Sequence, residues 1–209
     1  MSVPALFPVF LKLEGRNCLV VGGGTIGESK VKSLLVTGSQ VSLVAPNITS
    51  ALEKLARQGA IVWHPREFEV SDLTGMFVVI AATSNEEVND LIFREADRRG
   101  ILCNAVDQPP RCHFYFPAIV RRGALQIAIS TSGLSPSLAR RLRQELEEQF
   151  GPEYEGWLAW LGRVRAAVMS KGLSFEARRR LLDRLASREV FDRLQARNSS
   201  KKRLEGRIA

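Results

Sequence analysis

Residues 16–27 read RNCLVVGGGTIG, a short apolar run that leads directly into the pattern Gly22-x-Gly24-x-x-Gly27. The stretch 28–38 behind it has amphipathic spacing, and residues 40–44 (QVSLV) form a second strand-like run. A strand, a glycine turn, a helix and a second strand within about thirty residues form a βαβ unit that binds the pyrophosphate of a dinucleotide. We therefore expect the turn and the helix start to contact a dinucleotide cofactor, through Gly22, Gly23, Gly24, Thr25, Ile26 and Gly27.

The identity of the dinucleotide depends on the end of the second strand. In the usual fingerprint an acidic residue there binds the ribose 2′-hydroxyl of NAD, and an arginine accommodates the 2′-phosphate of NADP. This chain has Ala45-Pro46-Asn47, with neither a carboxylate nor an arginine. Asn47 can still hydrogen-bond the ribose, but the residues leave NAD and NADP both open. Thr83 follows the fourth apolar run, at the edge where such folds bind cofactor and substrate.

Five strand-like runs alternate with helical segments over residues 1–110. The further strands are expected at 61–63, 76–82 and 101–104, and the further helices at 50–59, capped by Ser50, and at 86–99. Segment 3–13 is expected to form an edge strand or to cover the sheet, and 64–75 to form a loop with a turn at 72–75. This alternation predicts an α/β fold, a Rossmann-type doubly wound parallel sheet.

The pattern changes after residue 110. Residues 112–119 and 125–130 read as a β-hairpin joined by the turn 121–123, because no helical segment separates them. Helices are expected at 136–150 (capped by Ser135), 153–171 and 174–195, followed by a mobile basic tail at 197–209. The expected domains are a cofactor domain (1–111), a hairpin-and-helix segment (112–150) and a helical basic C-terminal domain (151–209).

Composition excludes several classes of protein. The chain has 45% hydrophobic and 25% charged residues, which is ordinary for a soluble globular protein. No apolar run approaches the roughly 20 residues of a membrane span, and the N-terminus lacks the features of a secretory signal. Cys18, Cys103 and Cys112 fit neither a zinc site nor a disulfide framework. We therefore expect a cytoplasmic protein with no membrane partner.

The net charge of +8 is unevenly distributed. Residues 161–209 carry 14 Lys and Arg against 5 Asp and Glu, so this segment contains all of the excess positive charge. Such a segment attracts polyanions, although a solvated basic helical face has the same composition. Nucleic-acid binding would call for interleaved aromatic residues, and 175–197 has arginines with few aromatics.

Two places outside the glycine turn carry candidate chemistry. Asp107 directly follows the fifth expected strand, where the nicotinamide should lie, although an Asp before Pro-Pro can also simply form a turn. His113 lies in the expected hairpin, and a lone histidine more often packs than catalyses. The hydroxyl-rich turn 130–136 opens a helix that carries Arg140, which suits a substrate carboxylate but also fits an ordinary helix cap.

Seven motifs in order resemble one family, that of precorrin-2 dehydrogenase/sirohydrochlorin ferrochelatase, the N-terminal half of sirohaem synthases. They are PVFLKL (8–13), VVGGGTI (20–26), VAP (44–46), IAAT (80–83), NAVD (104–107), FYFPA (114–118) and ISTSGLSPSLAR (129–140), within residues 6–165. Two details depart from the common pattern: Gly27 stands where alanine is frequent, and Glu28-Ser-Lys30 replaces a more basic helix start.

The resemblance implies NAD-dependent oxidation of precorrin-2 to sirohydrochlorin, with Fe²⁺ insertion to sirohaem as a second reaction of many members. It implies Asp107 as the catalytic carboxylate, Pro46 and Asn47 on the adenosine side of NAD, and a homodimer formed through the segment after the Rossmann unit. To the polycarboxylate tetrapyrroles we assign His113, Ser132, Ser135 and Arg140 as binding residues, and we assign none to a resident metal. The length leaves no room for a fused methyltransferase, so we expect precorrin-2 to come from another protein.

A second hypothesis keeps the glycine turn but not the enzyme. A Rossmann regulatory protein that senses NAD(H) and binds nucleic acid through its basic tail would require neither Asp107 nor a substrate cleft. The motif set favours the dehydrogenase, and no nucleic-acid partner is expected.

Overall fold

The computed structural model describes the backbone of residues 5–205 and the side chains of residues 5–196. The chain divides into two compact units, Met1–Phe116 and Pro117–Ala209. Each unit is described by itself below. The predicted three-part division at residues 111 and 150 stays a prediction.

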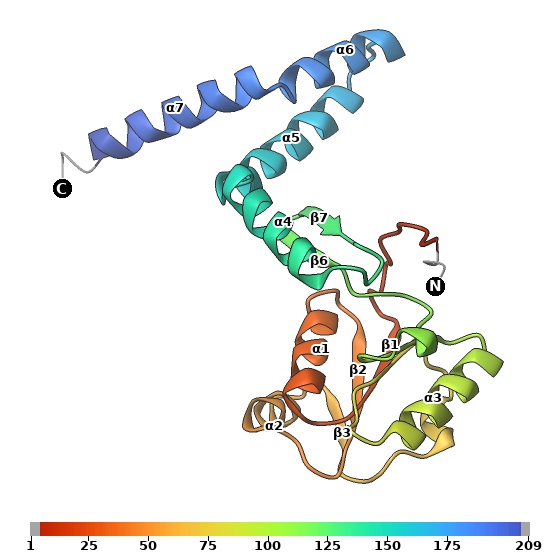
Figure 1. The fold of residues 1–209 in the computed structure, drawn as a ribbon. Helices are drawn as coiled ribbons and strands as arrows, with labels where there is room; N and C mark the ends of the chain where they lie inside the picture. The colour runs from red at the N-terminus through yellow and green to blue at the C-terminus, as the bar shows by residue number, and fades with distance from the viewer. Residues whose placement is uncertain (1–4, 206–209) are drawn as a thin grey trace. The chain divides into compact units, whose positions relative to one another are not determined.

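The first unit is built on five parallel strands in the order β3-β2-β1-β4-β5. The strands are β1 (Asn17–Val21), β2 (Gln40–Val44), β3 (Val62–His64), β4 (Val78–Ala81) and β5 (Leu102–Ala105). The connecting helices are α1 (Thr25–Leu35), α2 (Ser50–Arg57), the 3₁₀ turn η1 (Val70–Leu73) and α3 (Glu86–Arg98). Helices α1 and α2 cover one face of the sheet and α3 covers the other (Figure 1). The predicted Rossmann-type doubly wound sheet is confirmed.

The sheet is buried on both faces because successive side chains of each strand point to opposite sides. On β1, Val20 packs in one core cluster with Val31 of α1, whereas Leu19 packs in a second cluster with Ile92 of α3. All four side chains are buried. A strand covered on both faces needs apolar residues at every position, which is why the central strands read as continuous apolar runs.

The strands end in register at the carboxyl edge of the sheet. Val21 at the end of β1 is aligned with Val44 of β2 on one side and with Ala81 of β4 on the other, and Ala81 is aligned with Ala105 of β5. The loops that follow these strands therefore begin side by side. The strand order reverses between β1 and β4, and this switch point is where open α/β sheets bind their ligands.

An ion pair fixes the connection between β3 and β4. Arg66 donates through Nη1 and Nη2 to the two carboxylate oxygens of Asp72, at 2.9 and 2.6 Å, and the Glu69 N–H donates to Asp72 at 2.9 Å. The Arg66 hydrogen bonds hold the pKa of Asp72 below its ordinary value of 3.8. A carboxyl group with a lowered folded-state pKa stabilises the fold above its unfolded pKa, and that contribution is lost as the pH falls through the folded value.

We expect Asp72→Asn to lower the free energy of unfolding by about 1–2 kcal/mol at neutral pH, because charge-assisted bonds to a partly exposed guanidinium are lost. The measurement is urea unfolding of both proteins across the acid range. The difference should shrink as the pH falls from 3.8 through the lower folded-state pKa of Asp72, because protonation removes the charge on which the ion pair depends. A pH-independent difference would contradict the ion pair as its source.

The second unit begins with an antiparallel hairpin. Its strands are β6 (Ala118–Arg122) and β7 (Leu125–Ile129), and α4 (Pro136–Gln149) packs against both. Arg122 donates from Nε to the Phe150 carbonyl at 2.7 Å and from Nη2 to the Glu147 carbonyl at 3.0 Å. These bonds satisfy carbonyl groups at the end of α4, where a helix leaves acceptors without partners of its own. The prediction of Ser135 as the N-cap of this helix is confirmed, since its hydroxyl accepts from the Leu138 N–H.

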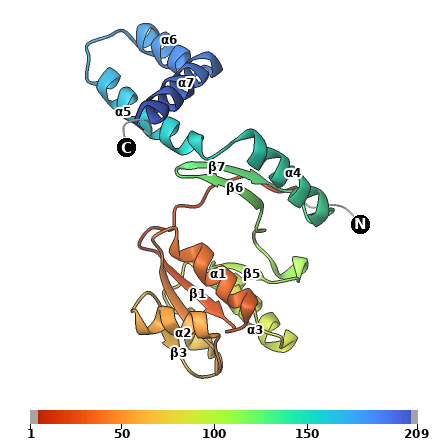
Figure 2. The same ribbon diagram turned by 90° about the vertical axis from the view of Figure 1, so that its left-hand side faces the viewer.

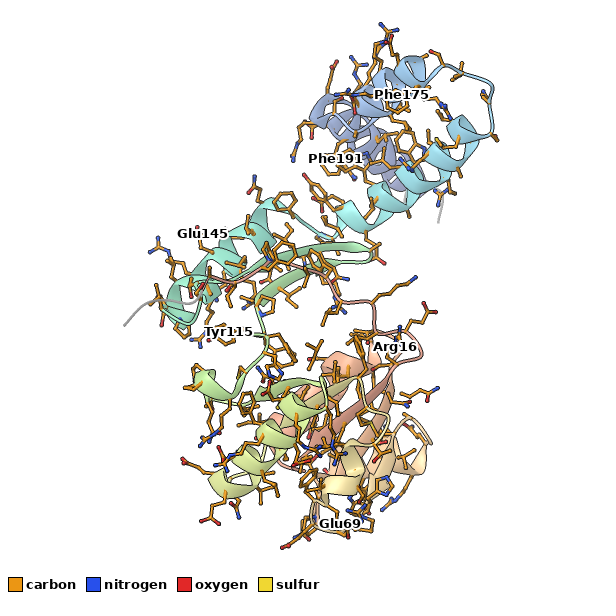
Figure 3. All side chains as sticks on the ribbon, turned by 90° about the vertical axis from the view of Figure 1, so that its right-hand side faces the viewer. Arg16, Glu69, Tyr115, Glu145, Phe175 and Phe191 are labelled. Carbon is orange, nitrogen blue, oxygen red and sulfur yellow. The ribbon has the colours of Figure 1, made fainter. Side chains whose placement is uncertain are left out.

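Three further helices follow in the described part of this unit: α5 (Glu153–Met169), α6 (Phe175–Leu185) and α7 (Arg188–Glu205) (Figure 2). Phe191 of α7, labelled in Figure 3, is 2% exposed. Its ring centroid lies 4.7 Å from those of both Tyr154 and Trp157 in α5. Arg188 donates to the Tyr154 hydroxyl at 2.9 Å. This aromatic cluster is the core that joins α7 to α5.

Several predicted boundaries in the second unit are wrong. The hairpin strand begins at Ala118 rather than 112, because residues 112–114 bond to β5 instead, and residues 121–122 belong to β6 rather than to the turn. The predicted helix 174–195 is two helices, divided at residues 186–187. The Ser187 hydroxyl accepts a hydrogen bond from the Val190 N–H at the start of α7. The backbone of α7 continues through Glu205 into the predicted tail, whose last residues, 206–209, lie outside the described part.

Predictions at the N-terminal side also need correction. Residues 5–12 form neither a strand nor a cover: Phe7 and Phe10 are 87% and 68% exposed, and Pro8 lacks the N–H that strand pairing needs. Leu13 at the end of this segment is buried in a core cluster of the sheet. Residues 3–4 of that prediction lie outside the described part. Helix α1 begins at Thr25 rather than at residue 28. The N-cap of α2 is Thr49, not Ser50, because the Thr49 hydroxyl accepts from the Leu52 N–H.

Helices long and apolar enough to cross a bilayer do not occur in residues 5–205.

Candidate active site

The turn after β1 requires glycine for steric reasons. Gly22 has φ +114°, and a Cβ added there would lie 2.3 Å from the carbonyl oxygen of Ala82, beyond the end of β4. A Cβ on Gly27 would lie 2.0 Å from the carbonyl oxygen of Gly22, so α1 starts tightly against the turn. Glycine is therefore required at Gly22 for the turn itself and at Gly27 for the close approach of α1 to that turn. The turn lies directly at the switch point between β1 and β4.

The N-terminus of α1 is open to a phosphate group. Gly24 is the N-cap and has no side chain to accept from the first N–H groups of the helix, and Thr25 and Ile26 are exposed. A Cβ on Gly24 would meet nothing within 4 Å, so open space lies in front of this residue. Free N–H groups and the positive end of the helix dipole favour an anion here. The turn therefore fits a dinucleotide pyrophosphate.

Glu28, one of the two departures from the family pattern, has a structural role. Its carboxylate accepts from the Thr49 hydroxyl at 2.6 Å and from Lys32 at 2.5 Å, and these bonds lower the pKa of Glu28. The Thr49 N–H also donates to the Gly23 carbonyl at 3.1 Å. Glu28 thus ties the loop after β2 to α1 and holds the exposed residues Pro46 and Asn47 beside the glycine turn.

The turn after β4 is held by a buried amide. Asn89 of α3 is 3% exposed; its Nδ2 donates to the Thr83 carbonyl at 3.1 Å, and its Oδ1 lies 2.7 Å from the Thr83 hydroxyl. Thr83 also bonds to the backbone of Asn85. The Thr83 side chain therefore shapes the turn, and contact with a cofactor would come through its backbone. Its cofactor role stays a prediction.

Hydrogen bonds between β5 and residues 112–114 close the loop that carries Asp107. Asn104, a buried polar residue, donates through Nδ2 to the Phe114 carbonyl at 2.8 Å, and a β-bridge pairs Asn104 with Cys112. Cys103 adds a second pair of bonds: its carbonyl accepts from the His113 N–H at 2.8 Å, and its N–H donates to His113 Nδ1 at 3.1 Å. The chain leaves β5, forms the loop and returns to the same strand.

Further hydrogen bonds, made by Arg111 and Cys112, hold the other side of the loop. Arg111 donates to Asp90 of α3 at 2.8 Å and to the Gln108 side chain at 3.1 Å. The Cys112 thiol donates to the Ala105 carbonyl at 3.1 Å, and its pKa is raised by burial. These bonds hold the loop against both β5 and α3.

Asp107 itself is exposed in this loop. It has φ +59°, a left-handed conformation that Asp and Asn adopt more readily than other residues with a Cβ. Among the described residues, none donates a hydrogen bond to its carboxylate. A carboxylate held at the carboxyl edge with free acceptor oxygens can accept a proton from a bound ligand.

Lys30 is a neighbour of Asp107 to which the sequence reasoning assigned no role. Its ammonium lies 3.7 Å from the centroid of the Phe116 ring. Burial lowers the pKa of Lys30, and the negative charge of Asp107 opposes this shift.

The sequence reasoning also assigned no role to Asn104 or Asn89. Asn104 carries a signal, because a polar side chain in a strand expected to be buried must find hydrogen-bond partners.

His113 lies outside the hairpin in which it was predicted. Its Nδ1 accepts from Cys103, so in the neutral ring Nε2 carries the proton and donates to Asp97, 3.1 Å away. The ring also packs against Phe93, with centroids 5.2 Å apart. Both nitrogens are engaged within the protein, and substrate binding by His113, which stays a prediction, would require it to leave Asp97.

The other predicted substrate residues belong to the second unit. Ser132 has φ +52°, and the Ser135 hydroxyl caps α4. Arg140 is exposed on α4 and makes no hydrogen bond or ion pair with any described residue. The first unit thus brings together the glycine turn, Pro46 and Asn47, Thr83 and Asp107, whereas Ser132, Ser135 and Arg140 stay predictions.

Comparison with known families gives two matches. Residues 9–118 match a family described as "Putative NAD(P)-binding", which covers more than half of the chain. The chain belongs to this family. Residues 122–149 match a second family, the central part of sirohaem biosynthesis proteins. The NAD(P)-binding description supports a nicotinamide dinucleotide as the cofactor of this chain.

Curated relatives carry the name siroheme synthase. Siroheme synthase 1 of Aeromonas salmonicida is 38% identical over 190 residues, which cover 91% of this chain and 41% of that protein. Siroheme synthase 1 of Yersinia enterocolitica is 42% identical over 170 residues, covering 79% of this chain and 36% of that protein. The chain therefore spans about two fifths of the length of these relatives.

A solved structure matches over its whole length. The structure of SirC, a precorrin-2 dehydrogenase, superposes with a TM-score of 0.81 and 26% identity, covering 96% of this chain and 100% of that chain. Together with the family matches, it confirms the resemblance to the precorrin-2 dehydrogenase family predicted from seven short motifs.

Proposed function

We propose that this chain is an NAD-dependent precorrin-2 dehydrogenase that produces sirohydrochlorin for sirohaem biosynthesis. The observation that carries the proposal is the match to SirC, a precorrin-2 dehydrogenase, along the full length of that chain. The siroheme synthase relatives support the same pathway. They give no support to the second hypothesis, an NAD(H)-sensing regulator with a nucleic-acid-binding tail.

The site residues fit the two parts of this reaction. When bound, the dinucleotide accepts a hydride from a ring carbon of precorrin-2. The glycine turn and the free N–H groups at the start of α1 hold the pyrophosphate, while Glu28 and Thr49 hold the loop on the adenosine side. Asp107 accepts the proton that leaves the macrocycle as its conjugation extends. The hydrogen bond from Asn104 to the Phe114 carbonyl closes the loop that carries this carboxylate.

The choice of NAD over NADP belongs to the proposal. The residues after β2 offer no arginine to a 2′-phosphate, and Asn47 is exposed there as a neutral partner for the ribose. A neutral side chain gains nothing from the phosphate charge, so NAD should give the higher kcat/KM.

Iron insertion into sirohydrochlorin is proposed as a second reaction. The macrocycle supplies its own nitrogen ligands to Fe²⁺, so the protein needs a base for the pyrrole N–H protons rather than a resident metal site. Asp107 can serve as that base. Among the described residues there is no group of three or more His, Cys, Asp or Glu side chains able to hold a metal. A homodimer formed through residues 112–150 and a cytoplasmic location also remain proposals.

The dehydrogenase is tested with precorrin-2 made in situ by a separate methyltransferase. Sirohydrochlorin should appear in the absorbance spectrum only when both the chain and a nicotinamide cofactor are present, with NAD preferred to NADP. Equal kcat/KM values would contradict only the NAD assignment. No product with either cofactor, together with a gel shift of DNA at moderate salt, would instead support the regulator.

A further inference from the structure

Three features of Lys30 indicate a positive charge that is available to bind an anionic ligand. It lies on α1, its side chain is half-buried, and its ammonium sits over the face of Phe116 at 3.7 Å from the ring centroid. Yet none of the residues with described side chains forms a hydrogen bond or an ion pair with this ammonium. The two cations nearest in sequence on α1 and α2 differ: Lys32 is paired with Glu28, and Lys54 is exposed on α2.

The platform under Lys30 is part of the Asp107 support. Phe116 packs edge-on against Phe114 with centroids 5.4 Å apart, and Phe114 packs against the core of the sheet. Asn104, which closes the Asp107 loop, donates to the Phe114 carbonyl. The same hydrogen-bonded segment therefore positions both the ring under Lys30 and the loop that carries Asp107.

The chemistry of this arrangement suits a carboxylate ligand. An ammonium has three N–H donors, and a cation–π contact uses the face of the ring without using those donors. Partial removal of water strengthens its attraction for an anion. Phe116 is 38% exposed and Asp107 is exposed, so a ligand has access from solvent.

We propose that Lys30 binds one peripheral carboxylate of the tetrapyrrole and so places the reacting edge of the macrocycle at Asp107. The inference rests on the proposed function, because the ligand is the polycarboxylate substrate or product of that reaction. Lys30 acts by binding and takes no part in the proton transfer. A carboxylate anchored at Lys30 also keeps the substrate edge close to Asp107 without a direct bond to that residue.

The experiment compares Lys30→Met with Lys54→Met, which removes the same charge from an exposed position on α2. Dissociation constants are measured for sirohydrochlorin by absorbance titration and for NAD by calorimetry, and kcat and KM are measured for dehydrogenation. Lys30→Met should raise the sirohydrochlorin dissociation constant and the KM about fivefold to tenfold, with kcat changed less than about twofold and the NAD constant unchanged. Lys54→Met should match the wild type.

Two further measurements separate charge from shape. Lys30→Arg should restore most of the affinity, because a guanidinium also stacks on an aromatic ring and pairs with carboxylates. Added salt should weaken sirohydrochlorin binding to the wild type more than binding to Lys30→Met. If Lys30→Met does not fold, as judged by circular dichroism, Lys30→Gln takes its place in the same titrations.

Each other outcome has a separate meaning. An unchanged sirohydrochlorin constant with a lower kcat would overturn the proposal and assign Lys30 to the support of Asp107. A raised NAD constant would overturn it in favour of a cofactor contact. A wild type that neither oxidises precorrin-2 nor binds sirohydrochlorin would refute the proposed function itself, whatever the variants do.

Discussion

Replacement of Asp107 by Asn should reduce the rate of precorrin-2 dehydrogenation by about 10²–10⁴-fold, the usual contribution of a general base. The amide has nearly the same size as the carboxylate but cannot accept the proton at neutral pH. Asn tolerates φ +59° at least as well as Asp, and the wild-type carboxylate accepts no hydrogen bond from a described residue. Folding and NAD affinity should therefore survive the substitution.

The controls follow from the backbone at this position. Asp107→Ala would mix loss of the base with strain at a positive φ, whereas Asp107→Gly removes the side chain without that strain. Asn and Gly variants should lose comparable activity, with unchanged thermal unfolding and NAD binding by calorimetry. Rates close to wild type in Asp107→Asn would remove this residue from the mechanism and make His113 the next base to test.

The same variant tests the second reaction. If Asp107 also accepts the pyrrole protons, enzyme-dependent Fe²⁺ insertion into supplied sirohydrochlorin should fall together with dehydrogenation. Loss of dehydrogenation alone would mean that metal insertion uses another base or does not belong to this chain. The rate of spontaneous insertion, measured without protein, is subtracted in both cases.

The sheet was predictable from the sequence because its physics is local and repetitive. Buried parallel strands need apolar residues at every position, and the turn after β1 needs glycine because an added Cβ would collide with Ala82 or with the turn itself. The doubly wound parallel sheet, the glycine turn and the position of Asp107 directly after the fifth strand were predicted from such local patterns. The errors lie where distant residues compete for the chain. Residues 112–114 have the sequence of a hairpin strand, but they form hydrogen bonds with Asn104 and Cys103 of β5 instead.

The supporting residues of the site were harder to predict for the same reason. Lys30 reads as an ordinary helix cation until Phe116, 86 positions later, is folded beside it. Phe191 of α7 packs on Tyr154 and Trp157 of α5, a contact that no local spacing reveals. Contacts of this kind are fixed by the tertiary fold.

Gly24→Asp should raise the dissociation constant for the dinucleotide at least tenfold, that is, by about 1.4 kcal/mol or more in binding free energy. A Cβ at this position meets nothing within 4 Å, and the Gly24 backbone has φ −76°, so the fold accepts a side chain here. The aspartate would place a negative charge and its bulk in front of the free N–H groups of α1, where the pyrophosphate must lie. Gly24→Asn is the matched control: it adds the same bulk without the charge and should weaken binding less. Calorimetry with NAD measures both variants, and thermal unfolding verifies that each remains folded. An unchanged affinity in folded Gly24→Asp would show that the pyrophosphate does not bind at the start of α1.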